Sequence, residues 1–300
     1  GVRLLLFGDL HQLPPVVQQH EVAGHLEDRH GGPFFFSVAS LMEGAGTYLL
    51  ELEQVFRQTD ADLISVLNAI RDGEVSAGEL DTLNTRVSPI RTLAEGEPFV
   101  ILTPTNAAAR RINTAYLDAL PGEGSRYTAT ITGDFSESVQ PAEAALDLKI
   151  GAKVMMLRND PDKRWVNGTV ARISRLKEKQ VFIEIAGREY EVEAVAWEHR
   201  RYAYDTAASK IVETVAGTFK QFPLRLAWAL TIHKAQGLTL DKVYVDLGRG
   251  TFAHGQTYVA LSRCRTLAGL ALARPLTPYD IKFDPTALGY RTRFLTPETS

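Results

Sequence analysis

Cysteine is nearly absent from this sequence: Cys264 is the single thiol among 300 residues. One thiol cannot form a disulfide within the chain, which excludes a disulfide-stabilised fold and fits a reducing compartment. Long apolar runs are absent as well, since none approaches the ~20 residues that cross a bilayer. There is no signal-peptide pattern either. We therefore expect a chain without a membrane span.

A strong excess of charge of one sign is also missing. The formal net charge is −3, so no global basic field points to nucleic acid, although a local basic stripe would be enough to bind it. The histidines show no metal spacing with acids or with the cysteine, and we expect no bound zinc. The 45% hydrophobic and 23% charged residues are typical of a globular protein with a large core, and the length suggests two domains.

The stretch from Thr231 to Asp241 is the most unusual part of the chain. It follows an amphipathic run that opens after Pro223, and it leads through Gly237 into an apolar run at 243–247. This order predicts a helix, a turn and a strand. The predicted helix end carries a hydroxyl, an imidazole, an ammonium and an amide within one turn, whereas helix stability calls for no more than a basic residue there. Such mixed polar groups suit a nucleotide or a phosphate backbone.

An apolar run at 2–7 predicts a buried central strand. It ends in the loop 8–16, where Asp9 and Gln12 offer polar groups at the carboxyl end of the strand, the place where α/β sheets bind ligands. An ordinary polar loop explains the same residues equally well. Because a chain rarely begins in mid-sheet, we expect further sequence upstream of Gly1.

Helix and strand signals alternate along the rest of the chain. The predicted elements are a buried helix at 34–42, a strand at 48–52, an amphipathic helix ending near Gly73, a strand at 99–102, a helix at 107–120, a helix at 255–265 and a last strand at 269–273. Taken alone, Arg57 is readily explained as a surface partner of a helix cap. Thr105 or Asn106 is a natural N-cap, and the free amides at that helix start also suit a phosphate.

Short alternating strands at 151–217 predict a small all-β module, with Asn167-Gly168 as a tight hairpin signal. Residues 158–179 carry seven Lys and Arg against three acids, an excess of four, and Trp165 lies among them. Basic residues interleaved with an aromatic suit single-stranded nucleic acid, but a solvated hairpin face explains such a run as well. We expect Tyr258 and Trp228 to belong to the core rather than to stack on bases.

Five segments occur in one order: GDLHQLPPV at 8–16, VFRQTD at 55–60, TPTN at 103–106, TIHKAQGLTLD at 231–241 and YVALSR at 258–263. In this order, with the β module between them, they resemble the C-terminal part of a superfamily-one, 5′-to-3′ helicase of the Pif/RecD-like branch, and bacterial Pif-type helicases most of all. The resemblance covers nearly the whole chain.

The resemblance implies an α/β fold of RecA-like parallel-sheet domains with an inserted SH3-like module. The implied boundaries are 1–50 for the end of the first RecA-like domain, 51–150 with 218–300 for the second, and 151–217 for the module. The family's Walker A loop, G-x-x-x-x-G-K-[ST], and its Walker B acidic pair do not occur in this sequence. By itself the chain is therefore not expected to hydrolyse ATP.

The resemblance also implies roles for residues at the nucleotide. Gln12 would sense the γ-phosphate and place the attacking water, and Asp9 would support its turn. Arg57 and Arg263 would be arginine fingers from the second RecA-like domain, which stabilise charge that spreads over the γ-oxygens. Further ATP contacts would come from Gln236 and Gly237. The cofactors implied are ATP and Mg²⁺, with the Mg²⁺ ligands expected upstream.

The implied DNA contacts are mainly to phosphates and ignore sequence. The residues that would line the single-strand track are Pro14, Pro15, Thr103, Thr105, Asn106, His233 and Lys234. The implied protein is an ATP-dependent 5′-to-3′ DNA helicase, monomeric, cytoplasmic and associated with the bacterial nucleoid, with roles in DNA repair and recombination. Its partners would be single-stranded DNA and forked duplex DNA.

Two other interpretations share these motifs. The chain would fit the helicase half of a relaxase or nuclease fusion, which an upstream catalytic domain would reveal. It would also fit a helicase-like clamp on single-stranded DNA without ATPase activity. Against the clamp, Gln12, Arg57 and Arg263 are all present although a clamp has no use for them.

Overall fold

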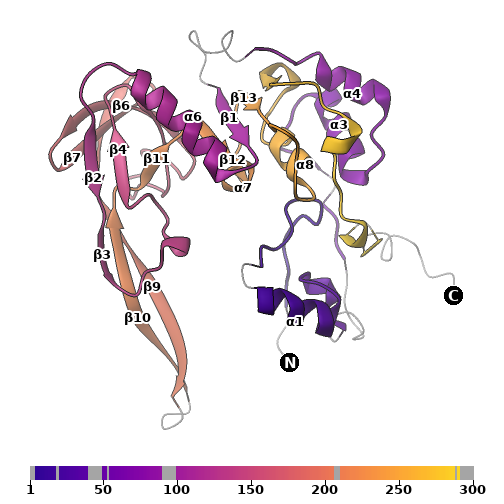
Figure 1. The fold of residues 1–300 in the computed structure, drawn as a ribbon, viewed down its shortest axis with the longest axis horizontal. Helices are drawn as coiled ribbons and strands as arrows, with labels where there is room; N and C mark the ends of the chain where they lie inside the picture. Colours follow the sequence, from indigo (N-terminus) through magenta and orange to yellow (C-terminus); the bar gives the residue numbers. More distant parts are fainter. Residues whose placement is uncertain are drawn as a thin grey trace. The chain divides into compact units, whose positions relative to one another are not determined.

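The computed structural model describes residues 4–17, 20–39, 49–52, 54–89, 99–205, 210–287 and 289–290. The chain divides into two compact units (Figure 1). Unit 1 comprises residues 1–106 and 230–300, and unit 2 comprises residues 107–229. Among the described residues, no helix has the length and apolarity required to cross a membrane.

A four-stranded sheet lies at the centre of unit 1, in the order β12-β1-β13-β14. β1 pairs with β13 and β13 with β14, both in parallel. All four strands are buried along nearly their whole length, as expected for a parallel sheet covered on both faces. Their bounds are Val100–Thr103 for β1, Ala229–Thr231 for β12, Val243–Val245 for β13 and Leu270–Leu272 for β14. The predicted α/β class is confirmed.

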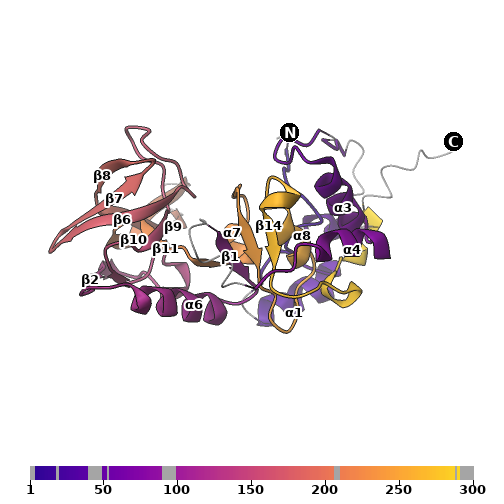
Figure 2. The ribbon, with the colours of Figure 1, turned by 90° about the horizontal axis from the view of Figure 1, so that it is seen from above.

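Helices of unit 1 gather beside this sheet, and Figure 2 shows α3, α4 and α8 on one side of its strands. Leu63, Leu67 and Ile70 form the buried stripe of α3, as their spacing predicts, and Gly73 ends it in the left-handed conformation with φ 74°. The bounds are His20–His30 for α1, Ala61–Asp72 for α3, Ala77–Asn84 for α4, Ile232–Ala235 for α7 and Gln256–Leu261 for α8, with short 3₁₀ turns η1 at Phe35–Ser37, η3 at Leu267–Gly269 and η4 at Pro278–Asp280.

Asp60 holds the start of α3 and also ties it to a distant segment. Its carboxylate accepts hydrogen bonds from the backbone N–H groups of Asp62 (3.1 Å) and Leu63 (3.2 Å), and from that of Leu267 (2.9 Å). These bonds, with the Leu267 N–H the largest contribution, lower the pKa of Asp60. The carboxylate therefore stabilises the fold above the ordinary pKa of an aspartate, and this stabilisation is lost as the pH falls through the lowered pKa.

Asp60→Ala is expected to lower the free energy of unfolding by about 1 kcal/mol or somewhat more, because a cap and a long-range hydrogen bond are lost together. Urea unfolding at pH 7 measures the effect. Asp81→Ala, at an exposed position on α4, is the control and should leave the unfolding midpoint nearly unchanged. Equal midpoints for the two variants would contradict the capping role.

Two predicted elements at the start of unit 1 are wrong. Leu4 to Phe7 form no strand and are exposed, with Phe7 at 90%, because none of the described strands pairs with them and an extended backbone gains nothing without a partner. The residues 49–52 likewise form no strand. Of the helix predicted at 34–42, the described residues form η1 and, after Val38, a helical residue at Ala39. Its remaining residues lie outside the described ranges, as do Val2, Arg3 and Tyr48.

The helix predicted after Pro223 is also wrong. The chain there forms two short strands, β11 at Leu224–Leu226 and β12, and the only helix is the single turn α7 that follows. Buried side chains occur on both faces of this run, so its apolar pattern fits a covered strand as well as a helix. The polar cluster of the 231–241 stretch therefore spans the whole of this one-turn helix. The hydroxyl of its N-cap Thr231 accepts the N–H of Lys234 at 3.3 Å, and Gln236 is its C-cap.

Unit 2 is rich in antiparallel strands. It contains a five-stranded sheet in the order β11-β5-β6-β7-β8, a three-stranded sheet β3-β10-β9 and the pair β2-β4. The bounds are Asn106–Ala119 for α6, Ser125–Thr128 for β2, Thr130–Gly133 for β3, Glu137–Val139 for the 3₁₀ turn η2, Ala145–Leu148 for β4, Lys153–Met156 for β5, Val170–Lys177 for β6, Gln180–Ile185 for β7, Arg188–Val192 for β8, Val195–Asp205 for β9 and Lys210–Gln221 for β10.

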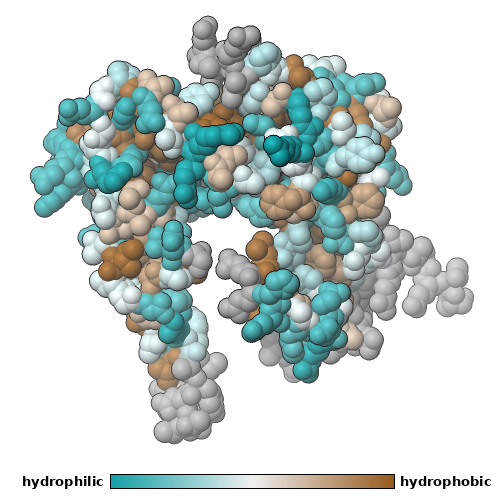
Figure 3. Space-filling model, viewed as in Figure 1, coloured by the Kyte–Doolittle hydropathy of each residue, from teal (hydrophilic) through white to brown (hydrophobic). Residues whose placement is uncertain are grey.

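The β-rich region therefore begins before residue 151 and ends after residue 217. The predicted domain boundaries, and the SH3-like character of the module, stay predictions. Asn167 and Gly168 do form a turn, with φ 90° at Gly168, but it lies inside a longer connection between β5 and β6 rather than in a two-residue hairpin. β9 and β10 form a long ribbon that extends from the rest of unit 2 in Figure 1. Figure 3 shows hydrophobic surface along this ribbon, and Val215 on β10 is an exposed apolar side chain.

Candidate functional site

The loop at 8–16 is held in shape by Asp9. One carboxylate oxygen accepts the backbone N–H of His11 at 3.0 Å, and the other accepts the side-chain amide of Gln12 at 3.0 Å. The backbone N–H of Gln12 closes the turn on the carbonyl of Asp9 at 3.2 Å. The support of this turn by Asp9, expected from the sequence, is confirmed, and it orients the Gln12 side chain.

Two distant residues meet this loop. The amide of Gln236 donates to Oε1 of Gln12 at 3.0 Å, and the hydroxyl of Tyr258 donates to Oδ2 of Asp9 at 3.4 Å. Burial, with a further contribution from the Asp9 carboxylate, raises the pKa of Tyr258 to about 12, so the hydroxyl keeps its proton at physiological pH. The loop at 8–16 is thus joined to α8 and to the turn after α7 by one chain of polar contacts.

Gly255 allows the loop to approach α8 this closely. Its φ is 72°, and a Cβ at this position would lie 2.6 Å from the carbonyl oxygens of both His11 and Gln12. Real side-chain atoms do not come this near to backbone oxygen, so only glycine fits without a displacement. The contact is therefore set by the absence of a side chain.

Arg57 lies in the extended segment before α3 and is half-buried. Its Nε donates to the hydroxyl of Thr239 at 3.1 Å, and its Nη1 donates to the carbonyl of Ser262 at 3.4 Å. These contacts join segments more than 180 residues apart in the sequence. They also bring Arg57 next to the turn that carries Arg263.

Arg263 follows the end of α8 and is fully buried, with 0% of its surface exposed. Its nitrogens donate to the carbonyl of Val259 (2.9 Å), the carbonyl of Leu238 (3.3 Å) and the hydroxyl of Ser262 (2.7 Å). Burial, with the nearby positive charge of Arg57 as the second cause, lowers the pKa of Arg263 to about 10. The side chain therefore remains a cation at neutral pH, and it is close enough to Arg57 for the two charges to repel each other.

Gln236 and Gly237 complete this group of residues, which we call the arginine cluster: Asp9, Gln12, Arg57, Gln236, Gly237, Tyr258 and Arg263. Gly237 has φ 83°, is exposed, and has open space where a Cβ would lie. A phosphate could approach the backbone here without meeting a side chain. Two cations, an oriented amide and an open backbone are a combination suited to a polyphosphate.

The predicted DNA-contacting residues divide into exposed and buried ones. Thr103 at the end of β1 is 1% exposed, and its hydroxyl donates to the carbonyl of Thr105 at 3.1 Å. It shapes the loop, whereas Thr105 and Asn106 are exposed at the start of α6. Pro14 is half-buried in the 8–16 loop, and Pro15 is exposed. A role for these residues in DNA binding stays a prediction.

α7 packs against β1 and presents two of the predicted track residues. Lys234 is exposed, whereas His233 is half-buried and burial lowers its pKa, so its imidazole is neutral at pH 7. The His233 ring lies nearly parallel to that of Phe252, at 15° and 6.5 Å between centroids, and Phe252 is 62% exposed. An exposed aromatic face beside a basic residue is an arrangement that can meet a nucleobase and its phosphate.

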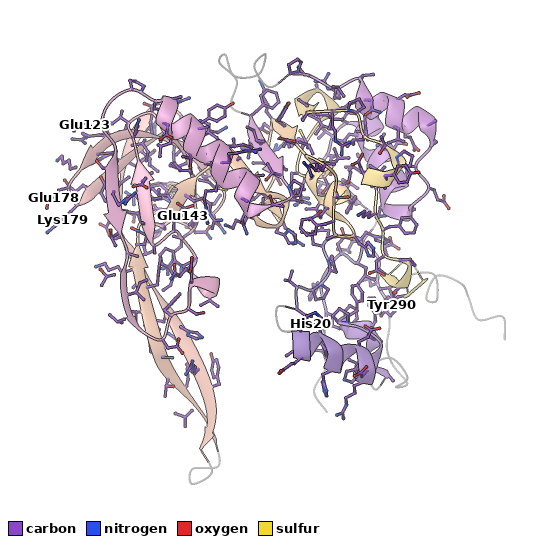
Figure 4. All side chains as sticks on the ribbon, in the orientation of Figure 1. His20, Glu123, Glu143, Glu178, Lys179 and Tyr290 are labelled. Atoms are coloured by element: carbon purple, nitrogen blue, oxygen red, sulfur yellow. The ribbon has the colours of Figure 1, made fainter. Side chains whose placement is uncertain are left out.

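The basic run at 158–179 is mostly engaged within unit 2. Trp165 is 7% exposed and belongs to the core of the unit, so its ring is not presented to a nucleobase. Arg164 forms an ion pair with Asp160 at 2.6 Å, and Arg175 lies 3.8 Å over the ring of Phe182. Figure 4 shows the end of the run, Glu178 and Lys179, at the outer turn between β6 and β7. The solvated face of a hairpin is the interpretation that these contacts favour.

Four residues in or beside the arginine cluster are not identified as site residues by the sequence. Tyr258 was expected in the core and is half-buried with its hydroxyl on Asp9, while Gln58, Thr239 and Ser262 bond the arginines or the backbone beside them. All four lie inside the matched segments. Their position within the five segments is the one signal that the sequence offers for them. Tertiary contacts decide which side chains of these segments turn inward.

A comparison with protein-family models found no match. Curated proteins similar to the chain are helicases. The chain is 32% identical to the ATP-dependent DNA helicase Pif1 of Bdellovibrio bacteriovorus, over 98% of this chain and 63% of that protein. It is 30% identical to the ATP-dependent DNA helicase PIF1 of Mus musculus, over 98% of this chain and 42% of that protein. The chain thus spans less than two thirds of the length of these relatives.

Solved structures agree with this comparison. Bacteroides sp. Pif1 in complex with ADP-AlF4 matches with a TM-score of 0.79 and 35% identity, over 96% of this chain and 66% of that one. Bacteroides Pif1 bound to single-stranded DNA matches with a TM-score of 0.73 and 36% identity, over 98% of this chain and 67% of that one. The chain belongs to the Pif1-like superfamily 1B helicases.

Proposed function

We propose that the protein containing this chain is an ATP-dependent DNA helicase that moves 5′-to-3′ on single-stranded DNA and separates duplex DNA. The observation that carries this proposal is the convergence of Arg57 and Arg263 beside the Gln12 loop, in a chain whose curated relatives are named ATP-dependent DNA helicases. Residues 1–50 would be the end of a first RecA-like domain, and residues 51–150 with 218–300 the second, with 151–217 inserted. We propose that it acts as a monomer in the cytoplasm.

ATP would supply the phosphoanhydride whose hydrolysis drives movement, and the arginine cluster has the chemistry to bind its phosphates. Arg57 and Arg263 would stabilise negative charge on the γ-oxygens, and Gln12, oriented by Asp9, would position the attacking water. Gln236 and the open backbone at Gly237 would contact the phosphates and sugar. In the described ranges, no group of three or more His, Cys, Asp or Glu is arranged to hold a metal ion.

Coupling between nucleotide and DNA would follow from the connectivity of unit 1. The turn after α7 bears Gln236 on the cluster side, and α7 itself bears His233 and Lys234 on the predicted track. A nucleotide that draws in the arginines would therefore also displace α7, the short segment whose side chains would contact the DNA strand. Alternation between two grips on the phosphate backbone would move the protein along it.

The function is tested with the whole protein that contains this chain. We expect its ATPase rate to rise with single-stranded DNA, and we expect it to displace a strand from a duplex with a 5′ single-stranded tail but not from one with a 3′ tail. Unwinding from the 3′ tail would contradict the polarity. No ATP hydrolysis with DNA present would contradict the helicase assignment.

A clamp on single-stranded DNA without ATPase activity is the second candidate, and one observation favours it. Arg263 is fully buried with each of its side-chain nitrogens donating to a protein oxygen, which is the arrangement of a structural arginine. For a clamp, DNA binding would be independent of ATP. ATP hydrolysis by the wild-type protein in the presence of single-stranded DNA separates the two candidates.

Lys234→Ala is expected to weaken binding to single-stranded DNA several-fold at low salt, because one phosphate contact is lost. The slope of log Kd against log salt concentration should decrease by about one, since one fewer counterion is released. Fluorescence anisotropy with an oligothymidine over a range of salt concentrations measures both. Arg29→Ala, an exposed cation on α1, is the control. An unchanged salt slope in Lys234→Ala would remove this residue from the track.

A further inference from the structure

Gln58 follows Arg57 directly but turns into the protein, where it is 7% exposed. Its side-chain amide donates to the carbonyl of Ser262 at 2.8 Å and to the carbonyl of Cys264 at 3.0 Å. These two carbonyls lie on either side of Arg263 in the sequence. Since both partners are acceptors, only the NH₂ end of the side chain fits, and both of its N–H groups are used.

The same carbonyl of Ser262 also accepts Nη1 of Arg57 at 3.4 Å, while the hydroxyl of Ser262 accepts Nη2 of Arg263 at 2.7 Å. Both arginines therefore donate a hydrogen bond to Ser262. Gln58, the chain neighbour of Arg57, donates a hydrogen bond to the Ser262 carbonyl, although the two residues are 204 positions apart in the sequence. The Gln58 amide thus holds the backbone of the turn that carries Arg263 next to the backbone of the segment that carries Arg57.

Building on the proposed function, we propose that Gln58 is a positioning residue: it clamps the turn at 262–264 so that the Arg57 and Arg263 side chains reach one phosphate group together. Two guanidinium groups repel each other, and nothing in their own charges keeps them close. This repulsion lowers the pKa of Arg263: burial is the first cause and the charge of Arg57 is the second. The buried Gln58 amide, with its two hydrogen bonds, resists this repulsion. Because the amide is neutral, it adds no charge that would compete with the nucleotide for the arginines.

A displacement of about 1 Å in catalytic groups can cost on the order of a hundredfold in rate. The change to test is Gln58→Met, because methionine has a similar length and shape but no N–H group. In the whole protein we expect the kcat of DNA-stimulated ATP hydrolysis to fall about 10- to 100-fold, with KM for ATP and Kd for single-stranded DNA changed less than about threefold. This split is expected because the arginines act on the transition state.

A matched control is available in unit 1. Asn84 also bridges distant backbone with its amide, accepting the N–H of Leu276 at 2.7 Å and donating to its carbonyl at 3.0 Å, and it contacts neither arginine. Asn84→Leu should reduce thermal stability comparably to Gln58→Met and leave kcat near the wild-type value. If Gln58→Met lowers kcat no more than Asn84→Leu does, Gln58 is only a structural residue and the inference is overturned.

A double-mutant cycle gives the readout that a merely structural role would not change. If Gln58 acts by placing the arginines, Gln58→Met should have little further effect on single-turnover hydrolysis in an Arg263→Ala background. Effects that multiply in full would overturn the inference. Failure of the proposed function looks different: the wild-type protein would then hydrolyse no ATP with DNA present.

A structural measurement tests the clamp even without ATPase activity. In a crystal structure of Gln58→Met, the distance from Arg57 Nη1 to the Ser262 carbonyl should differ from that in the wild-type crystal structure, since the turn at 262–264 has lost its two amide bonds. An unchanged distance and an unchanged turn in the variant would overturn the inference.

Discussion

Arg263→Ala is expected to lower the DNA-stimulated ATPase rate of the whole protein at least ~100-fold while binding to single-stranded DNA persists. A cation inserted beside the γ-phosphate stabilises charge that develops in the transition state, and its removal costs roughly 10³-fold or more in related phosphoryl transfers. The contacts that point to this role are those with Ser262 and the proximity of the Arg57 charge. Steady-state hydrolysis with saturating oligothymidine measures the effect.

Because Arg263 is fully buried, the alanine variant also loses three hydrogen bonds inside unit 1. Arg263→Lys separates these effects, since it keeps a charge and much of the volume but loses the planar fork that can bond several oxygens. It should fold with a melting temperature closer to that of wild type and still lose most of the hydrolysis. Wild-type hydrolysis in Arg263→Ala would refute the finger assignment.

Gly255→Ala is expected to destabilise the protein by about 2–5 kcal/mol. A left-handed conformation costs an alanine roughly 1–2 kcal/mol, and a Cβ forced against backbone oxygen adds roughly 1–3 kcal/mol. The atoms it meets are the carbonyl oxygens of His11 and Gln12, which cannot rotate away as a side chain could. ATP hydrolysis should fall as well, because the loop that carries Gln12 must move away from α8.

Gly31→Ala is the matched control for this substitution. Gly31 has φ 71°, against 72° at Gly255, and has open space around its Cβ position, so its substitution carries the conformational cost alone. Urea unfolding of both variants should place Gly255→Ala well below Gly31→Ala in stability. If both variants were destabilised equally, the loop at 8–16 would not be in close contact with Gly255 in solution.

Local rules along the chain predict several elements well. The spacing of Leu63, Leu67 and Ile70 predicts the helix α3, and Gly73 marks its observed end after Asp72. The apolar run at 99–102 and the N-cap residue types that follow it give β1 and the start of α6. For the two helices, the periodicity and the capping residues of one short segment are sufficient, because residues of the same helix provide the hydrogen bonds. β1 pairs with the distant β13, and its continuous apolar run alone identifies it as a buried strand.

The same rules fail where the partner is distant in sequence. The run after Pro223 is apolar on both sides, and only pairing with β5 makes β11 a strand rather than part of a helix. The apolar run at 4–7 has a strand's composition, but no described strand pairs with it. Trp165 sits among cations in the sequence, and only the packing of unit 2 shows that its ring faces the core.

The order of the five segments was enough to place this chain in its family and to nominate Arg57, Arg263 and Gln12, because residue type and spacing are properties of the linear chain. Their convergence, the burial of Arg263 and the clamping position of Gln58 were decided by tertiary structure alone. The convergence and the position of Gln58 depend on hydrogen bonds between residues about 200 positions apart, which no local pattern encodes.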